Sequence, residues 1–273
     1  MKLGSFFLSI ISERCNIINP LKVRSIEIGA GIPKIVVPIV SKTMEEIYSD
    51  TKSIVLSGAE VIEWRADFYN DVLSTQKIKE VLHTLRPLIG DIPLIFTIRT
   101  DAEGGNITIQ DTKYAEILRF AASTGDADLI DVELFRNEIS VEELVKDIHT
   151  QGALVIMSNH DFHKTPEKTE IISRLRKMQD LGADFPKIAV MPNSSEDVLT
   201  LLSATDEMAR VYGEKPLVTM AMGGLGSISR VSGEIFGSAL TFGNAGKCSA
   251  PGQMPVSELK HCLNTLHTAL DQS

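Results

Sequence analysis

Lys187 lies in an apolar run, from Phe185 to Met191, that is typical of a buried strand. An ammonium group removed from water must find a partner or lose its proton. A neutral lysine amine is a nucleophile, and its characteristic use is a Schiff base with a ketone or an aldehyde. In the alternative interpretation, Lys187 stands at a strand end and extends its amine into solvent. The run alone leaves both interpretations open.

Further side chains suited to acid–base chemistry follow other predicted strands. His160 follows the apolar run Ala153–Met157, and Glu103 follows the run Leu94–Ile98. His160 could move the protons next to an imine as general base and acid, and Glu103 could orient its ring. Arg230 offers a planar fork for a carboxylate or a phosphate. Together these residue types predict a Schiff-base lyase, either an aldolase or a dehydratase acting on a polyhydroxy keto acid.

The cluster of His160, Asp161 and His163 raises the alternative of a metal site. Zinc would need a third convergent ligand, for which Glu133 is the candidate. The remaining histidines, at positions 83, 149, 261 and 267, fall on predicted helices rather than at strand ends. The sequence therefore favours a site without metal.

The elements that must position these residues follow a βα period. Eight apolar or β-branched runs begin roughly 20 to 35 residues apart, which is the span of a βα unit. Near-continuous apolar strands are typical of a parallel sheet that is covered on both faces. We therefore predict an α/β fold, a single-domain (βα)8 TIM barrel, with its site at the C-terminal ends of the strands. The alternative, a dinucleotide-binding open sheet, lacks a GxGxxG motif after the first strand. The predicted strands are Ile35–Val40, Val61–Trp64, Leu94–Ile98, Leu129–Val132, Ala153–Met157, Ile188–Met191, Leu217–Met222 and Ala239–Phe242.

Two details of the strand around Lys187 matter for the chemistry. Lys187, Ala189 and Met191 share one strand face, opposite Ile188 and Val190. A small Ala189 above the lysine would leave room for a substrate inside the barrel. However, the predicted strand, Ile188–Met191, places Lys187 near its beginning, far from the C-terminal end. Either the strand begins earlier, or the side chain extends along the barrel interior towards His160.

Composition narrows the class of protein. The chain has 273 residues, of which 43% are hydrophobic, and its net charge of −9 disfavours nucleic acid and a membrane surface as partners. Cys15, Cys248 and Cys262 form no CxxC pair, which favours a reducing, cytoplasmic compartment. We interpret residues 1–19 as an N-terminal extension rather than a signal peptide, and residues 20–273 as the catalytic barrel.

Six segments, taken together and in this order, resemble the type I 3-dehydroquinate dehydratase family. The resemblance extends from about residue 33 to the end of the chain. Any one of the segments alone would be a weak match, whereas the set is specific. The segments are Glu63-Trp64-Arg65, Phe96–Arg99 with Glu103-Gly104-Gly105, Ser158–Phe162, Pro186–Ala189, Ser229-Arg230 and Ser249–Gln253.

The resemblance implies a barrel enzyme of the shikimate pathway, usually a homodimer, that uses no metal and no organic cofactor. Such enzymes dehydrate 3-dehydroquinate to 3-dehydroshikimate. By this resemblance, Lys187 attacks the C3 ketone, and His160 removes a C2 proton and protonates the departing C1 hydroxyl. Glu103 is similar to the carboxylate that orients the histidine, and Arg230 to the clamp on the substrate carboxylate. The other implied substrate contacts are Glu63, Arg65, Arg99, Ser249, Gln253, Met220 and Met222.

Two alternatives remain at this point. A Schiff-base aldolase acting on a phosphorylated sugar is favoured by the glycine-rich turns that begin at Gly223 and Gly243, which could hold a phosphate. The same glycines could instead permit a mobile flap. A non-catalytic barrel that binds an acidic metabolite is the other alternative, and the combination of lysine, histidine and glutamate argues against it.

Overall fold

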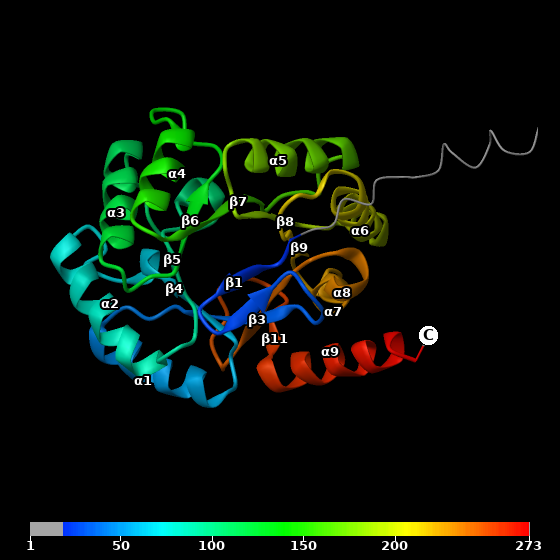
Figure 1. The fold of residues 1–273 in the computed structure, drawn as a ribbon, viewed down its shortest axis with the longest axis horizontal. Coiled ribbons are helices and arrows are strands. Elements are labelled where there is room, and N and C mark those ends of the chain that lie inside the picture. The colour runs from blue at the N-terminus through cyan, green and yellow to red at the C-terminus, as the bar shows by residue number, and fades with distance from the viewer. Residues whose placement is uncertain (1–18, 273) are drawn as a thin grey trace, which may run out of the picture.

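A nine-stranded parallel sheet curls into a barrel inside a ring of helices in the computed structural model, which describes residues 19–272 (Figure 1). The predicted α/β barrel fold is confirmed, and all eight predicted strands are present with shifted ends. The barrel strands are β3 (Lys34–Ile39), β4 (Val61–Arg65), β5 (Leu94–Thr97), β6 (Leu129–Glu133), β7 (Leu154–Asp161), β8 (Phe185–Val190), β9 (Val218–Ala221) and β10 (Leu240–Asn244).

The barrel closes at two unequal seams. Strand β10 pairs in parallel with β3, with Leu240 opposite Lys34. Between β9 and β10 the connection is a single bridge from Leu217 to Ser238, just ahead of both strands. There the amide of Ala239 donates to the carbonyl of Leu217 at 2.7 Å. A short ninth strand, β11 (Met254–Pro255), adds to β10 on its free side.

The covering helices begin where side chains satisfy their first amide groups. Thr43 and Ser194 form capping boxes, and the Ser140 side chain accepts from the amide of Glu143. Thr165-Pro166, which by residue type predicts a helix start, instead precedes its helix. The helices are α1 (Met44–Leu56), α2 (Thr75–Ile89), α3 (Asp111–Ser123), α4 (Val141–Thr150), α5 (Lys168–Asp180), α6 (Ser195–Glu207), α7 (Ser227–Val231), α8 (Gly233–Phe236) and α9 (Val256–Leu270).

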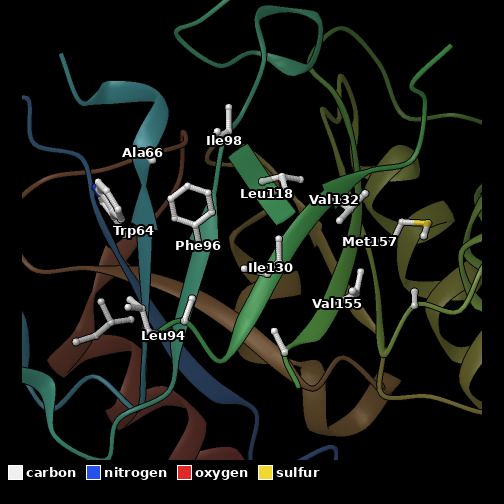
Figure 2. Close-up of a cluster of buried hydrophobic side chains, with 14 of the residues drawn as sticks. Trp64, Ala66, Leu94, Phe96, Ile98, Leu118, Ile130, Val132, Val155 and Met157 are labelled. Atoms are coloured by element: carbon white, nitrogen blue, oxygen red, sulfur yellow. The ribbon is translucent and has the colours of Figure 1, made fainter. Parts of the chain in front are cut away.

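Alternation along each strand separates an outer core from the barrel interior. Trp64 points outward from β4, and its ring meets that of Phe96 edge-on at 5.4 Å between centroids (Figure 2). Leu118 of α3 packs into the same outer core. Because side chains alternate, Glu63 and Arg65 on either side of Trp64 face the interior.

An antiparallel hairpin, β1 (Leu21–Val23) and β2 (Ile26–Ile28), precedes the barrel and has no counterpart among the predicted elements. Val23 and Ile28 pack into the inner core with the first residues of the barrel strands, so the hairpin covers the N-terminal end. Of the predicted extension, only Asn19 belongs to the described residues. Within residues 19–272, no helix is both long and apolar enough to cross a bilayer.

Candidate active site

A cavity of about 450 Å³, counting its space open to solvent, lies inside the barrel towards the C-terminal ends of the strands. Ten of the eleven predicted site residues line it, although they are spread over most of the chain. The exception is Arg230. The cavity is lined by Glu63, Arg65, Arg99, Glu103, His160, Lys187, Met220, Met222, Ser249 and Gln253, together with Gly104, Phe162, Ala189, Phe242 and Ala250.

Lys187 is the third residue of β8 and is only 4% exposed. The strand begins at Phe185, earlier than the predicted start at Ile188. This earlier start, the first of the two explanations considered above, accounts for the position of Lys187 along the strand. Ala189 lies one step further along the same face and lines the cavity, whereas Ile188 and Val190 pack into the outer core. The predicted facing of the strand is confirmed, and the interpretation of Lys187 as a solvent-reaching cation is wrong.

Two carboxylates and an aromatic ring lie next to the amine of Lys187. Its Nζ atom lies 3.4 Å from Asp131 Oδ2 and 4.0 Å from Glu63 Oε1. The ring of Phe242 lies beneath it, 4.6 Å from Nζ to the centroid, at cation–π distance. An iminium at this position would meet the same two carboxylates and the same ring.

Asp131 is the functional candidate that the sequence analysis missed. It is fully buried on β6, and it accepts from Arg99 Nη2 at 2.8 Å and from Ser158 Oγ at 2.6 Å, besides Lys187. Burial alone would raise its pKa, but Arg99 and Lys187 hold the pKa below its ordinary value. An aspartate inside an otherwise apolar predicted strand, which is rarely buried without a partner, is the sequence signal that could have identified it.

His160 and Glu103 form a dyad at the cavity wall. The ring Nδ1 atom lies 2.9 Å from Glu103 Oε2, and the His160 amide donates to the same oxygen at 3.1 Å. Asn159 Nδ2 donates to the other carboxylate oxygen at 3.1 Å. With Nδ1 bound to the carboxylate, Nε2 is the nitrogen left to act on a substrate.

Burial perturbs both members of the dyad in opposite directions. It lowers the pKa of His160 well below its ordinary value, and the nearby cations Arg99 and Lys187 add to this effect. Burial raises the pKa of Glu103 to about 8, although Arg99 opposes it. The imidazole is therefore neutral at pH 7, and its free nitrogen can accept a proton from a substrate.

Arg99 lies in the cavity wall with its guanidinium bound by protein groups. Its Nη2 atom donates to Asp131, and its Nη1 atom donates to Glu133 at 3.1 Å and to Ser158 at 2.9 Å. Nη1 also lies 3.5 Å from Glu103 Oε2. One cation therefore connects the carboxylate beside Lys187 with the carboxylate beside His160.

Glu63 and Arg65 both face the cavity, but they do not pair with each other in the way a simple strand ion pair would. Arg65 makes two 2.8 Å hydrogen bonds to Asp67, and Glu63 accepts from Thr97 Oγ1 at 2.9 Å. Both side chains are thus held in place by neighbouring residues while they line the cavity.

Arg230 lies behind the cavity wall rather than in it. It is 1% exposed, and its Nη1 and Nη2 atoms donate to the carbonyls of Phe242 at 3.4 Å and Pro251 at 3.0 Å. Among the described residues no carboxylate pairs with it, and its buried Nε atom has no partner. Burial lowers its pKa to about 10, so the guanidinium stays charged at neutral pH.

The loop that carries Ser249 and Gln253 folds over the mouth of the cavity. The Ser249 amide donates to Gln253 Oε1, and Gln253 Nε2 donates to Ser249 Oγ, both at 3.0 Å. The amide of Gly223, in the glycine-rich turn after β9, donates to the Pro251 carbonyl at 3.2 Å. That turn therefore holds the loop, and its first amide is not free to bind a phosphate.

The residues considered for a metal site have other partners. Asp161 accepts from the amides of His163 and Lys164, each at 3.0 Å, and Glu133 is bound by Arg99 and Arg136. Within the part of the chain that the structure describes, no three histidines, cysteines or carboxylates are arranged to hold a metal ion.

Comparison with known proteins connects this geometry to one family. A family sequence model for type I 3-dehydroquinase matches residues 35–269. The 3-dehydroquinate dehydratase of Clostridioides difficile (strain 630) is 49% identical over 251 residues, covering 92% of this chain and 98% of that protein. The crystal structure of the type I 3-dehydroquinate dehydratase from Clostridium difficile, with covalent modified comenic acid, has a TM-score of 0.90 at 49% identity and covers 93% of this chain and 100% of that chain. The 3-dehydroquinate dehydratase of Geobacillus kaustophilus HTA426 has a TM-score of 0.89 at 36% identity, covering 92% of this chain and 97% of that chain. The chain belongs to the type I 3-dehydroquinase family.

Proposed function

We propose that this protein dehydrates 3-dehydroquinate to 3-dehydroshikimate, a reaction of the shikimate pathway, through a Schiff base on Lys187. The observation that carries the proposal is the placement of a buried lysine and a neutral histidine in the wall of one cavity. A nucleophilic amine and a separate proton carrier are the two groups that an imine-assisted elimination needs.

The reaction proceeds through an iminium and an enamine. The Lys187 amine, as free base, adds to the C3 ketone, and uptake of one proton with loss of one water gives an iminium. His160 Nε2 takes the C2 proton, and the electron pair of that C–H bond forms an enamine. The enamine expels the C1 hydroxyl, which receives the proton from His160 and departs as water. Addition of water to the resulting iminium then releases the enone product, the free amine of Lys187 and the proton taken up in the first step, so the net change is loss of one water.

Three carboxylates support the charges that appear in these steps. Asp131, at 3.4 Å from Nζ, and Glu63, at 4.0 Å, stabilise the iminium. Glu103 Oε2 lies 2.9 Å from Nδ1 of His160, and the imidazolium formed by proton removal favours the ionised form of this carboxyl group. Each interaction is stronger with the intermediate than with the free substrate, which is the condition for lowering a barrier.

The remaining predicted residues bind the substrate in this proposal. Arg230, a buried cation without a carboxylate partner among the described residues, binds the substrate carboxylate as the loop of Ser249 and Gln253 adjusts. Glu63, Arg65 and Arg99 bind hydroxyl groups at the polar side of the cavity. Met220 and Met222 form its apolar side.

The aldolase alternative is less well supported. A phosphorylated sugar would need free backbone amides in the glycine-rich turns, and the Gly223 amide already donates to Pro251. Arg230 suits a carboxylate by its planar fork, and the neighbouring Ser249 and Gln253 suit hydroxyl and carboxylate oxygens.

Turnover tests the proposed function directly. The protein is mixed with 3-dehydroquinate, and the absorbance of the conjugated enone product is followed, with Lys187→Ala as the control for contaminating activity. A steady rise for the wild-type protein and none for the variant supports the proposal. No rise with the wild-type protein, under conditions where the substrate binds, would overturn it.

We also propose a cytoplasmic homodimer that uses no metal and no organic cofactor. The described cysteines, Cys248 and Cys262, are both free thiols, as proteins of reducing compartments have them. Light scattering of the eluting protein measures the oligomeric state, and a monomeric mass at micromolar concentration would contradict the homodimer. Full activity after dialysis against a chelator is the expected result for an enzyme without metal.

A further inference from the structure

Asn159 and Arg174 extend the dyad of His160 and Glu103 away from the cavity. Asn159 precedes His160 on β7, is 5% exposed, and donates from Nδ2 to Glu103 Oε1 at 3.1 Å. On its other side, Arg174 of α5 donates from Nη1 to Asn159 Oδ1 at 2.9 Å. Neither residue lines the cavity.

Arg174 determines the orientation of the Asn159 carboxamide. The two ends of a carboxamide have nearly the same shape, so its orientation is decided by its partners. A guanidinium can only donate, and it therefore binds the amide oxygen. As a result the NH₂ group of Asn159 faces Glu103, and the carboxylate receives a donor rather than a second acceptor.

Arg174 is itself held in place from two sides. Its Nε atom donates to Glu170 Oε1 at 2.8 Å on the same helix, and its guanidinium carbon lies 5.5 Å from the centre of the Phe135 ring. The side chain is 19% exposed, so it connects the protein surface with the buried dyad. A continuous series of hydrogen bonds runs from Arg174 through Asn159 and Glu103 to His160.

We propose that Arg174 and Asn159 are positioning residues that hold the Glu103 carboxylate in the orientation His160 requires for proton transfer. They touch neither the substrate nor Lys187. Their effect on the reaction passes through the carboxylate, because Glu103 Oε1 is bound by Asn159 while Oε2 is bound by His160. The proposal rests on the dehydratase function above and adds to it two residues outside the cavity.

The charges around Glu103 give the direction of the expected pH effect. Burial raises its pKa to about 8, Arg99 and the hydrogen bond from Asn159 lower the pKa, and Glu133 and Asp131 raise it. Removing the Asn159 donor therefore raises the pKa of the dyad. Asn159→Asp raises it further, because a second carboxylate would then face Glu103 across a 3.1 Å contact.

The test compares five variants by steady-state kinetics over pH. Arg174→Met and Asn159→Leu are expected to lower kcat about 10- to 100-fold, with KM changed less than about threefold, because proton transfer is impaired more than binding. The apparent pKa of the dyad is read from the pH profile of kcat and identified by its loss in Glu103→Gln. This pKa is expected to rise in Asn159→Leu, and to rise most in Asn159→Asp. Arg174→Lys, which keeps a donor, recovers part of the loss.

A matched control comes from the same helix. Arg176 is exposed on α5 and lies over the ring of Tyr212 instead of Asn159. Arg176→Met is expected to keep the wild-type kcat and pH profile. In Arg174→Met the borohydride-trapped adduct should still form, since Lys187 is untouched, and a stable adduct also shows that the variant is folded.

The results separate this inference from the proposed function. If the wild-type protein neither turns over nor forms an adduct, the dehydratase proposal fails first. If the wild-type protein is active while Arg174→Met and Asn159→Leu keep its kcat and its dyad pKa, the positioning role is wrong. Equal losses in Arg174→Met and Arg176→Met, without a shift in pKa, would also overturn it, because they would indicate a general effect on the helix.

Discussion

Asp131→Asn removes the negative charge beside Lys187 and leaves the shape of the side chain nearly unchanged. The amide oxygen can still accept from Arg99 and Ser158, but its NH₂ group would face the lysine amine, a donor against a donor, at about the present 3.4 Å. For two unit charges at that distance, Coulomb's law with an effective dielectric constant of about 20 corresponds to a gross attraction of about 5 kcal/mol.

Part of that attraction offsets the cost of burying the two charges, so the net effect is smaller. Removing one partner of a buried ion pair lowers the free energy of unfolding by about 3–5 kcal/mol, and we expect a loss at the lower end because Arg99 keeps three other acceptors. The iminium loses the same counter-charge. At 1.4 kcal/mol per factor of ten, a loss of about 3 kcal/mol in the barrier lowers kcat/KM by about 100-fold.

Two assays measure these effects separately: urea denaturation for stability, and the rate of borohydride-trapped adduct formation for the imine step. Asp184→Asn is the matched control. Asp184 is also a buried aspartate, but it binds His149 and the Val155 amide just before β8 and faces no cavity residue. Asp184→Asn should lose stability and keep its adduct rate. If Asp131→Asn forms the adduct at the wild-type rate, the role assigned to this carboxylate is refuted.

Three more predictions concern the dyad and the loop. His160→Ala should still form the imine but lose most proton transfer, so that the covalent adduct accumulates on mixing with substrate, whereas an unmodified protein in the mass spectrum would contradict its role as acid and base. The free energy of unfolding of the wild-type protein should fall as the pH rises from 4.5 towards 8, by about 1.4 kcal/mol per pKa unit, because the folded-state pKa of Glu103, about 8, lies above the ordinary 4.5. Glu103→Gln should remove this pH dependence. Urea denaturation at pH 5 and pH 9 measures the free energy of unfolding at each pH. An equal difference between the two values in the wild-type protein and in Glu103→Gln would count against the raised pKa. Gly252→Ala should raise KM, because Gly252 has φ +78° and a Cβ atom there would lie 2.4 Å from the Gly223 carbonyl oxygen, which displaces the loop over the cavity; an unchanged KM would mean that the loop does not contribute to binding.

Much of the barrel could be predicted from the sequence because its strands are buried on both faces. Buried parallel strands produce apolar runs, and those runs recur at the period of a βα unit. The facing of Lys187 was also predictable, since alternation along a strand needs no knowledge of its ends. The ends themselves were less certain, and Phe185 and Pro186 belong to β8 although the predicted strand begins at Ile188.

The features that escaped prediction depend on contacts between distant segments. The three-residue strands at Leu21 and Ile26 are too short to show a period, and only packing against the barrel defines them. Asp131 is a partner of Lys187 because β6 and β8 flank β7, which no local pattern encodes. Arg230 was identified by its residue type, but its position behind the cavity follows from the fold of the loop around Pro251.

The proposed reaction requires a covalent intermediate on Lys187, which can be detected by measuring the intact mass of the protein. The wild-type protein is mixed with 3-dehydroquinate, reduced with borohydride, weighed, and digested to locate the modification. We expect a stable adduct on the peptide that contains Lys187, and no adduct in Lys187→Ala. An unmodified wild-type protein that nevertheless turns over substrate, or an adduct on a different lysine, would contradict it.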